Sequence, residues 1–60
     1  SKGEYDKAIA YYEKSLKITL ATLGENHPST ATSYNNIGLA WDSKGEYDKA
    51  IAYYEKSLKI

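Results

Sequence analysis

Apolar residues recur at steps of three and four through the first third of the chain, with charged and small polar residues between them. The stripe consists of Tyr5, Ala8, Ile9, Tyr12, Leu16, Thr19, Leu20 and Leu23. This spacing places side chains on one face of an α-helix and predicts a helix over about residues 4–23. A second stripe beside the first predicts that the helix packs against neighbours on two sides; it consists of Tyr11, Ser15, Ile18 and Thr22. Gly24 ends the helix, because glycine adopts the left-handed conformation without a Cβ penalty.

A second helical pattern begins after a short loop. Pro28 fits the first position of a helix, where its missing N–H is not needed, and His27 before it is the expected capping residue. The apolar side of this pattern comprises Ala31, Tyr34, Ile37, Gly38 and Trp41. The spacing predicts a helix over residues 28–44. Gly38 costs about 1 kcal/mol in helix propensity, so we expect it to let the backbone of a neighbouring helix come close.

The segment Ser1–Ile18 recurs without a change as Ser43–Ile60, 42 residues further along the chain. The second occurrence predicts a third helix over about residues 46–60, with Gly45 as the stop of the helix before it. A connection this short makes the second and third helices an antiparallel hairpin. Repetition at a period of roughly 20 to 50 residues is typical of arrays in which no unit buries its apolar face alone.

Composition narrows the classes of partner. Eight lysines balance eight acidic residues, and the chain has neither arginine nor cysteine. A neutral balance removes the basic footprint of a protein that binds nucleic acid or an anionic membrane. Disulfides and thiolate metal sites are excluded, which favours the cytoplasm without deciding the compartment. No apolar run approaches the roughly 18 residues of a membrane span, and no signal-peptide pattern opens the chain.

One motif runs through both helical patterns of the second half of the chain. Its positions are aromatic, aliphatic, glycine and alanine in a fixed order, namely Tyr34, Ile37, Gly38, Trp41, Gly45, Tyr47, Ala50 and Tyr54. This motif resembles the tetratricopeptide repeat, and the first copy continues the likeness through Gly3, Tyr5, Ala8 and Tyr12. The segment 23–28 and the period of 42 residues resemble the longer repeats of the kinesin light chain, since the standard unit has about 34 residues. Leu20 departs from the family, which usually has a proline there.

The resemblance implies an all-α fold in which antiparallel helix-turn-helix repeats stack as a right-handed superhelical solenoid. Residues 1–24 are then the second helix of one repeat, and residues 28–60 are the helical hairpin of the next. Because repeat arrays need about three units, we expect a segment of a longer array or a member of an assembly. The positions expected to pack are Tyr5, Ala8, Tyr12, Tyr34, Ile37, Gly38, Trp41, Tyr47, Ala50 and Tyr54.

The resemblance also implies that the first helix of each unit lines a concave groove that holds peptides. On the helix over 28–44 the side without apolar packing residues is polar and nearly uncharged; it carries Thr32, Asn35, Asn36, Leu39, Asp42 and Ser43. An asparagine amide offers donors and an acceptor together, so Asn35 or Asn36 could pair with the N–H and C=O of an extended peptide. The predicted function is a protein-interaction scaffold that binds an extended peptide or a partner helix, with no cofactor. The alternative for the amides is a solvated face.

Other functions compete with this one. A structural role is the main alternative, because identical copies with exposed repeat ends favour self-association by end-to-end stacking or exchange of helices. Trp41 and the tyrosines could form an aromatic cage for a ligand, but at helical spacing they are expected to be core. His27 alone, without cysteine, does not make a metal site. Ser33, His27 and Asp42 supply the residue types of a catalytic triad without an enclosed pocket, so no enzymatic activity is expected.

Overall fold

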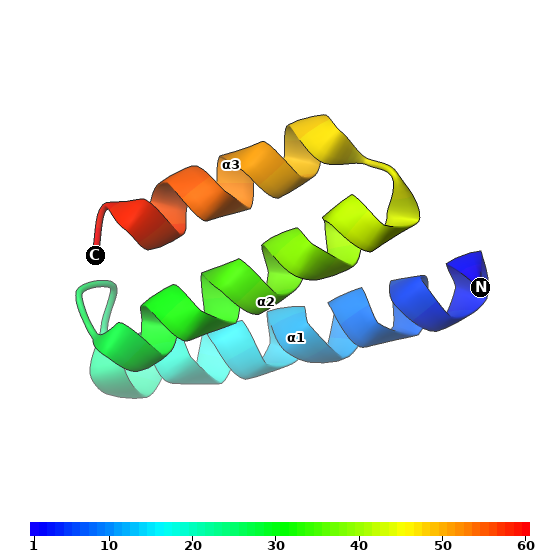
Figure 1. The fold of residues 1–60 in the computed structure, drawn as a ribbon. Helices are drawn as coiled ribbons and strands as arrows, with labels where there is room; N and C mark the ends of the chain where they lie inside the picture. The colour runs from blue at the N-terminus through cyan, green and yellow to red at the C-terminus, as the bar shows by residue number, and fades with distance from the viewer.

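The structure, a computed structural model, describes residues 1–60 as three α-helices: α1 (Lys2–Leu23), α2 (Pro28–Lys44) and α3 (Tyr47–Leu58). It contains no strand. Helix α2 lies between the other two and runs antiparallel to both, so α1 and α3 point the same way (Figure 1). The predicted all-α fold of three helices is confirmed, with boundaries that differ by one or two residues. The stacking of such units into a superhelix stays a prediction.

The loop between α1 and α2 is fixed by hydrogen bonds to its backbone. Gly24 has a φ of 83°, and its N–H bonds to the carbonyl of Leu20 at 3.1 Å. The Nδ1 atom of His27 accepts a hydrogen bond from the N–H of Ser29 at 3.0 Å, and Pro28 follows at the first helical position. The predicted helix stop at Gly24 and the cap at His27 are therefore confirmed, but the ψ of Gly24 is 175°, so its backbone is not in the left-handed helical conformation expected there. The hydroxyl of Thr30, a fully buried residue, reaches back to the carbonyl of Gly24 at 2.7 Å.

The turn between α2 and α3 depends on Gly45, whose φ of 88° and ψ of 9° are left-handed. The N–H of Gly45 bonds to the carbonyl of Asp42, and the N–H of Glu46 bonds to that of Trp41, both at 2.9 Å. These two bonds are those of a Schellman motif. Gly3 occupies the same place in the first copy but lies inside α1. The same sequence is thus a turn after α2 and a helix in α1. Only the second copy follows a helix, so only there does the chain have to reverse its direction.

The core is built around α2. The buried residues of the chain are Ile9, Leu16, Thr30, Ile37, Gly38, Ala40 and Ala50. Ile37 has no exposed surface. At Gly38 the approach of α3 is so close that an added Cβ would lie 2.6 Å from Cε1 of Tyr54. A close helix contact at this glycine is present, but the expected approach of a neighbouring backbone is wrong, because the atoms that lie against Gly38 belong to the aromatic ring of Tyr54.

The two identical copies present different faces to α2. Helix α1 buries Ile9 and Leu16, whereas their counterparts in α3, Ile51 and Leu58, are exposed. Helix α3 instead packs through Ala50 and Tyr54 of the first stripe and through Tyr53 and Ser57 of the second. The Ser57 hydroxyl donates to the carbonyl of Ala31 at 3.1 Å. In α1 the second stripe, with Tyr11 and Ile18, is exposed. The first stripe therefore packs on α2 in both copies, through different residues, whereas the second stripe packs on α2 only in α3.

Candidate protein-binding surface

The six residues predicted to bind a partner lie on α2. Five of them are exposed, namely Thr32, Asn35, Leu39, Asp42 and Ser43. Asn36 is half-buried. Leu39 is 50% exposed, which is unusual for a large apolar side chain at the centre of a helix that is covered on two sides. The surface is therefore accessible and mixed in chemistry, with apolar, amide, hydroxyl and carboxylate groups.

A groove between α1 and α2 brings half of this surface together with residues of α1. Its volume is about 260 Å³, and its lining comprises Tyr5, Ala8 and Tyr12 from α1 with Asn36, Leu39, Ala40 and Ser43 from α2. Thr32, Asn35 and Asp42 do not line it. Pockets for small molecules usually measure about 300 to 1,000 Å³. This groove is therefore sized for a side chain of a partner rather than for a separate small ligand.

The chemistry of the groove is apolar with a few polar groups at its edge. Ala8, Ala40 and Leu39 give an aliphatic lining, and none of the lining residues is charged. Tyr5 and Tyr12 are each exposed by more than a third. The sequence pattern predicts only packing for these two tyrosines. Their spacing of seven residues on one face was the available signal, but only the position of α1 beside α2 shows that they also line a groove.

The amides of the surface are free to bind. The side chains of Asn35 and Asn36 make no hydrogen bond within the chain, whereas the hydroxyl of Thr32 donates to the carbonyl of Pro28 at 3.2 Å. An unpaired amide can donate and accept at once, which matches the alternating groups of a peptide backbone. Thr32 has already used its only hydroxyl hydrogen. The two asparagines are therefore better placed to bind a backbone than the threonine.

The largest hollow of the molecule lies elsewhere, at the start of α3. It measures about 360 Å³, but its lining is a single run of consecutive residues, 45–49. Such a hollow is the open surface of a helix start, with no second element opposite it. The smaller groove between α1 and α2 is the better candidate, because two helices form its walls.

Trp41 does not form a cage for an outside ligand. The Nζ atoms of Lys49 and Lys44 lie 4.3 Å and 5.1 Å from the centre of its ring. These are cation–π distances, so two lysines of the chain itself already occupy the ring. The indole Nε1 is buried without a hydrogen-bond partner. The expectation that Trp41 belongs to the packed part of the chain agrees with this arrangement.

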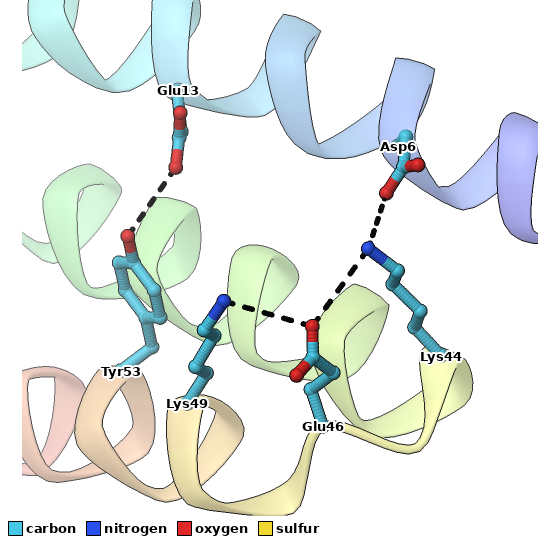
Figure 2. A network of polar contacts seen from close by, with 6 residues as sticks. All are labelled: Asp6, Glu13, Lys44, Glu46, Lys49 and Tyr53. Carbon is cyan, nitrogen blue, oxygen red and sulfur yellow. Dashed lines mark hydrogen bonds and ion pairs between the residues drawn. The ribbon is translucent and has the colours of Figure 1, made fainter.

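A polar network joins the three helices along one edge (Figure 2). Lys44 lies between Asp6 of α1, at 2.6 Å, and Glu46 before α3, at 3.8 Å. Its side chain is only 18% exposed. The hydrogen bond to Asp6 raises the pKa of the Lys44 ammonium above its ordinary value of 10.5. Glu46 also pairs with Lys49 at 3.6 Å.

A separate hydrogen bond joins Tyr53 of α3 to the middle of α1 (Figure 2). The Tyr53 hydroxyl donates to Oε1 of Glu13 at 3.4 Å, which connects the two copies of the repeated sequence directly. Burial, and then the negative charge of Glu13, raise the pKa of the Tyr53 phenol. The cluster of Asp6, Lys44, Glu46 and Lys49 is structural in character, because its charges are paired with one another.

The residue types of a triad do not form a reactive group here. The Ser33 hydroxyl donates to the carbonyl of Ser29 at 3.1 Å, and the Nδ1 atom of His27 is used as the cap of α2. No group of His, Asp or Glu side chains is arranged to hold a metal ion. Each of the three helices is too short or too polar to cross a membrane.

Antiparallel helices that carry one sequence twice, with an accessible groove between two of them, define a helical-repeat protein. The family model described as tetratricopeptide repeat matches residues 1–60, and the chain belongs to this family. Tetratricopeptide repeats are scaffolds for protein–protein interaction and are typically not catalytic. Comparison with curated proteins and with solved structures gave no significant match.

Proposed function

We propose that this scaffold binds an extended peptide or a partner helix across α2, with one apolar side chain of the partner in the groove between α1 and α2. The single observation that carries the proposal is the composition of that groove, which joins Leu39 and two tyrosines to the amide of Asn36 without any charge. Non-catalytic binding is part of the proposal.

The recognition would divide between the groove and the outer side of α2. An apolar side chain has little desolvation free energy to lose on entering the groove. A charged side chain would lose its hydration there without meeting an opposite charge. Asn35 and Asn36 would pair with the backbone of the partner, which makes the contact tolerant of its sequence. The proposal therefore predicts selectivity for one apolar position and tolerance at its neighbours.

Binding of synthetic 12-residue peptides tests the proposal. The peptides share an Ala/Ser background and differ only at the centre, which is Leu, Tyr, Lys or Asp, and each is measured by fluorescence anisotropy against the chain and against an array of three periods. We expect the Leu and Tyr peptides to bind best. Replacing both Asn35 and Asn36 by alanine should weaken binding by about tenfold, equivalent to the loss of about one or two net hydrogen bonds. Asn26→Ala, in the loop before α2, is the matched control and should have no effect.

A second variant separates the groove from the amides. Leu39→Glu places a charge in the groove at a half-exposed position, so the fold should be kept. We expect it to reverse the preference from Leu-centred to Lys-centred peptides. Equal binding of all four peptides by the chain, or unchanged binding after both substitution sets, would show that this surface is not the binding site.

A further inference from the structure

One unpaired charge stands beside the groove between α1 and α2. None of the residues that line the groove is charged. Among the six residues of α2 predicted to bind a partner, Asp42 alone carries a charge, and it is exposed. The other charged residue of α2 is Lys44, whose side chain is only 18% exposed and pairs with Asp6. The exposed charge of α2 is therefore that of a single carboxylate.

The Asp42 carboxylate has no partner within the chain. It takes part in none of the ion pairs, and only its backbone carbonyl is used, as the acceptor for the N–H of Gly45. Burial, and then the negative charge of Asp42, raise the pKa of the Tyr54 phenol on α3. A phenol is uncharged at neutral pH, so Tyr54 does not neutralise the carboxylate. Asp42 is therefore free to pair with a cation from outside the chain.

The position of Asp42 is unfavourable for the helix itself. It lies in the last turn of α2, where the aligned peptide dipoles leave partial negative charge. Cations stabilise this end of a helix, and the lysine of the same turn, Lys44, is already engaged by Asp6. The helix therefore gains nothing from the Asp42 carboxylate, whereas a bound cation would compensate both its charge and the end of the dipole.

The spacing of Asp42 from the groove suits an extended peptide. Asp42 lies three residues after Leu39, which lines the groove. Side chains three apart on a helix are neighbours, with about 5–6 Å between their Cβ atoms. In an extended peptide, side chains on the same side are two residues, or about 6–7 Å, apart. A peptide side chain in the groove beside Leu39 therefore places the second residue before or after it at Asp42.

We propose that Asp42 binds a lysine or arginine of the partner, two residues from the apolar side chain that enters the groove. This inference rests on the proposed function and names the partner more closely, as an extended peptide that carries one apolar and one basic residue at that spacing. The tolerance expected at neighbouring positions of the peptide then has one exception, at the residue that faces Asp42. An acidic residue at that position is repelled.

Peptides of 12 residues with Leu at the centre of an Ala/Ser background test the spacing. In one series the residue two positions after the centre is Lys, Ala or Glu, and in the other it is the residue two positions before. An exposed ion pair changes affinity by up to about fivefold. In the series that matches the direction of the bound peptide, we expect Lys to strengthen and Glu to weaken binding by about threefold each, measured by fluorescence anisotropy. Lys five positions from the centre should have no effect, and about 1 M salt should remove the difference between Lys and Glu.

Charge reversal identifies the residue that makes the contact. Asp42→Lys should reverse the preference, so that the Glu peptide binds more tightly than the Lys peptide by about tenfold, the product of the two threefold effects. Glu55→Lys is the matched control, because it changes the net charge equally at an exposed residue of α3, a helix that does not line the groove. It should keep the preference of the wild-type chain. Both substitutions lie at exposed positions, so the helical circular dichroism should be unchanged.

A peptide with Ala at the centre separates this inference from the proposed function. Equal affinity of the Lys, Ala and Glu peptides in both series, with Leu still preferred over Ala at the centre, would overturn the inference and leave the groove as the binding site. A preference that Asp42→Lys does not change would overturn it as well. Equal binding of the Leu-centred and Ala-centred peptides would contradict the groove, and with it the spacing from which the basic residue is inferred.

Discussion

The ring of Tyr54 occupies the space that a side chain at Gly38 would need, with only 2.6 Å between Cε1 and the position of an added Cβ. Real Cβ atoms essentially never approach a neighbour so closely. The two residues therefore set the distance between α2 and α3. Tyr12, the counterpart of Tyr54 in α1, meets no such glycine and lines the groove instead.

Gly38→Ala should destabilise the fold. Overpacking costs about 1–3 kcal/mol, and the gain of about 1 kcal/mol in helix propensity offsets only part of it. We expect a net loss of about 1 kcal/mol in the free energy of unfolding, measured by urea denaturation followed through the fluorescence of Trp41. Adding Tyr54→Leu should relieve the overlap, so the effect of the alanine should become smaller in that background. An equal loss in both backgrounds would mean that the ring is not the cause.

The repeated glycines should respond in opposite ways. Gly45→Ala forces a Cβ into a left-handed conformation and should cost about 1–2 kcal/mol. Gly3→Ala lies in a helix with no atom within 4 Å of the new Cβ, so it should be neutral or stabilise by up to about 1 kcal/mol. Thermal unfolding followed by circular dichroism compares the two. Similar effects of both would contradict the different conformations of the two copies.

The ion pair between Asp6 and Lys44 should show in the alkaline range. The pKa of Lys44 is raised by folding, mainly by its hydrogen bond to Asp6. A cation of this kind contributes its full stabilisation below its unfolded pKa and loses it as the pH rises through the folded value. We expect the urea midpoint to fall as the pH rises above the ordinary lysine pKa of 10.5, and to fall less in Asp6→Asn.

The control for this prediction is Asp48→Asn, the same substitution at the unpaired copy. It should keep the alkaline dependence of the wild-type chain. The raised pKa values of Tyr53 and Tyr54, caused first by burial, act in the same direction because the unfolded chain loses its phenolic proton first. Both variants retain these tyrosines. Identical pH profiles of the two variants would exclude the Asp6 pair as a source of the dependence.

Thr30→Val should weaken the connection between α1 and α2. The valine removes the only side-chain donor to the Gly24 carbonyl, at a position with no exposed surface, and should cost about 1–3 kcal/mol. Thr22→Val is the control, because that hydroxyl bonds an exposed carbonyl of its own helix at 2.8 Å. It should change the free energy of unfolding by less than about 0.5 kcal/mol. Chemical denaturation at neutral pH measures both.

Local patterns were sufficient to predict most of the fold. The steps of three and four, Pro28 with His27, and the two glycines each depend on backbone chemistry that acts within a few residues, so the three helices and their turns could be located. The boundaries of α1 and α3 depend on more than the local pattern. Identical sequences begin at Lys2 in α1 and at Tyr47 in α3, and the difference comes from the helix that precedes the second copy.

Only the part of the candidate site that lies on α2 could be predicted from the sequence. The polar face of α2 follows from its own spacing, and Leu39 is exposed on it. The contribution of Tyr5 and Tyr12 depends on where α1 lies beside α2, which no local pattern states. The same limit applies to Tyr47, which was expected to pack but is 62% exposed within the chain. Its packing role stays a prediction.

Because α2 is enclosed by the helices before and after it in sequence, the packing of the molecule joins neighbours along the chain, and only the hydrogen bond from Tyr53 to Glu13 links α3 to α1. Such local connectivity allows rapid folding, since no long loop has to close before the first contacts form. It also orders the opening of the native state. Either outer helix can detach while the other still protects one side of α2, so the amide hydrogens near Ile37 should exchange with solvent last and report the global unfolding event.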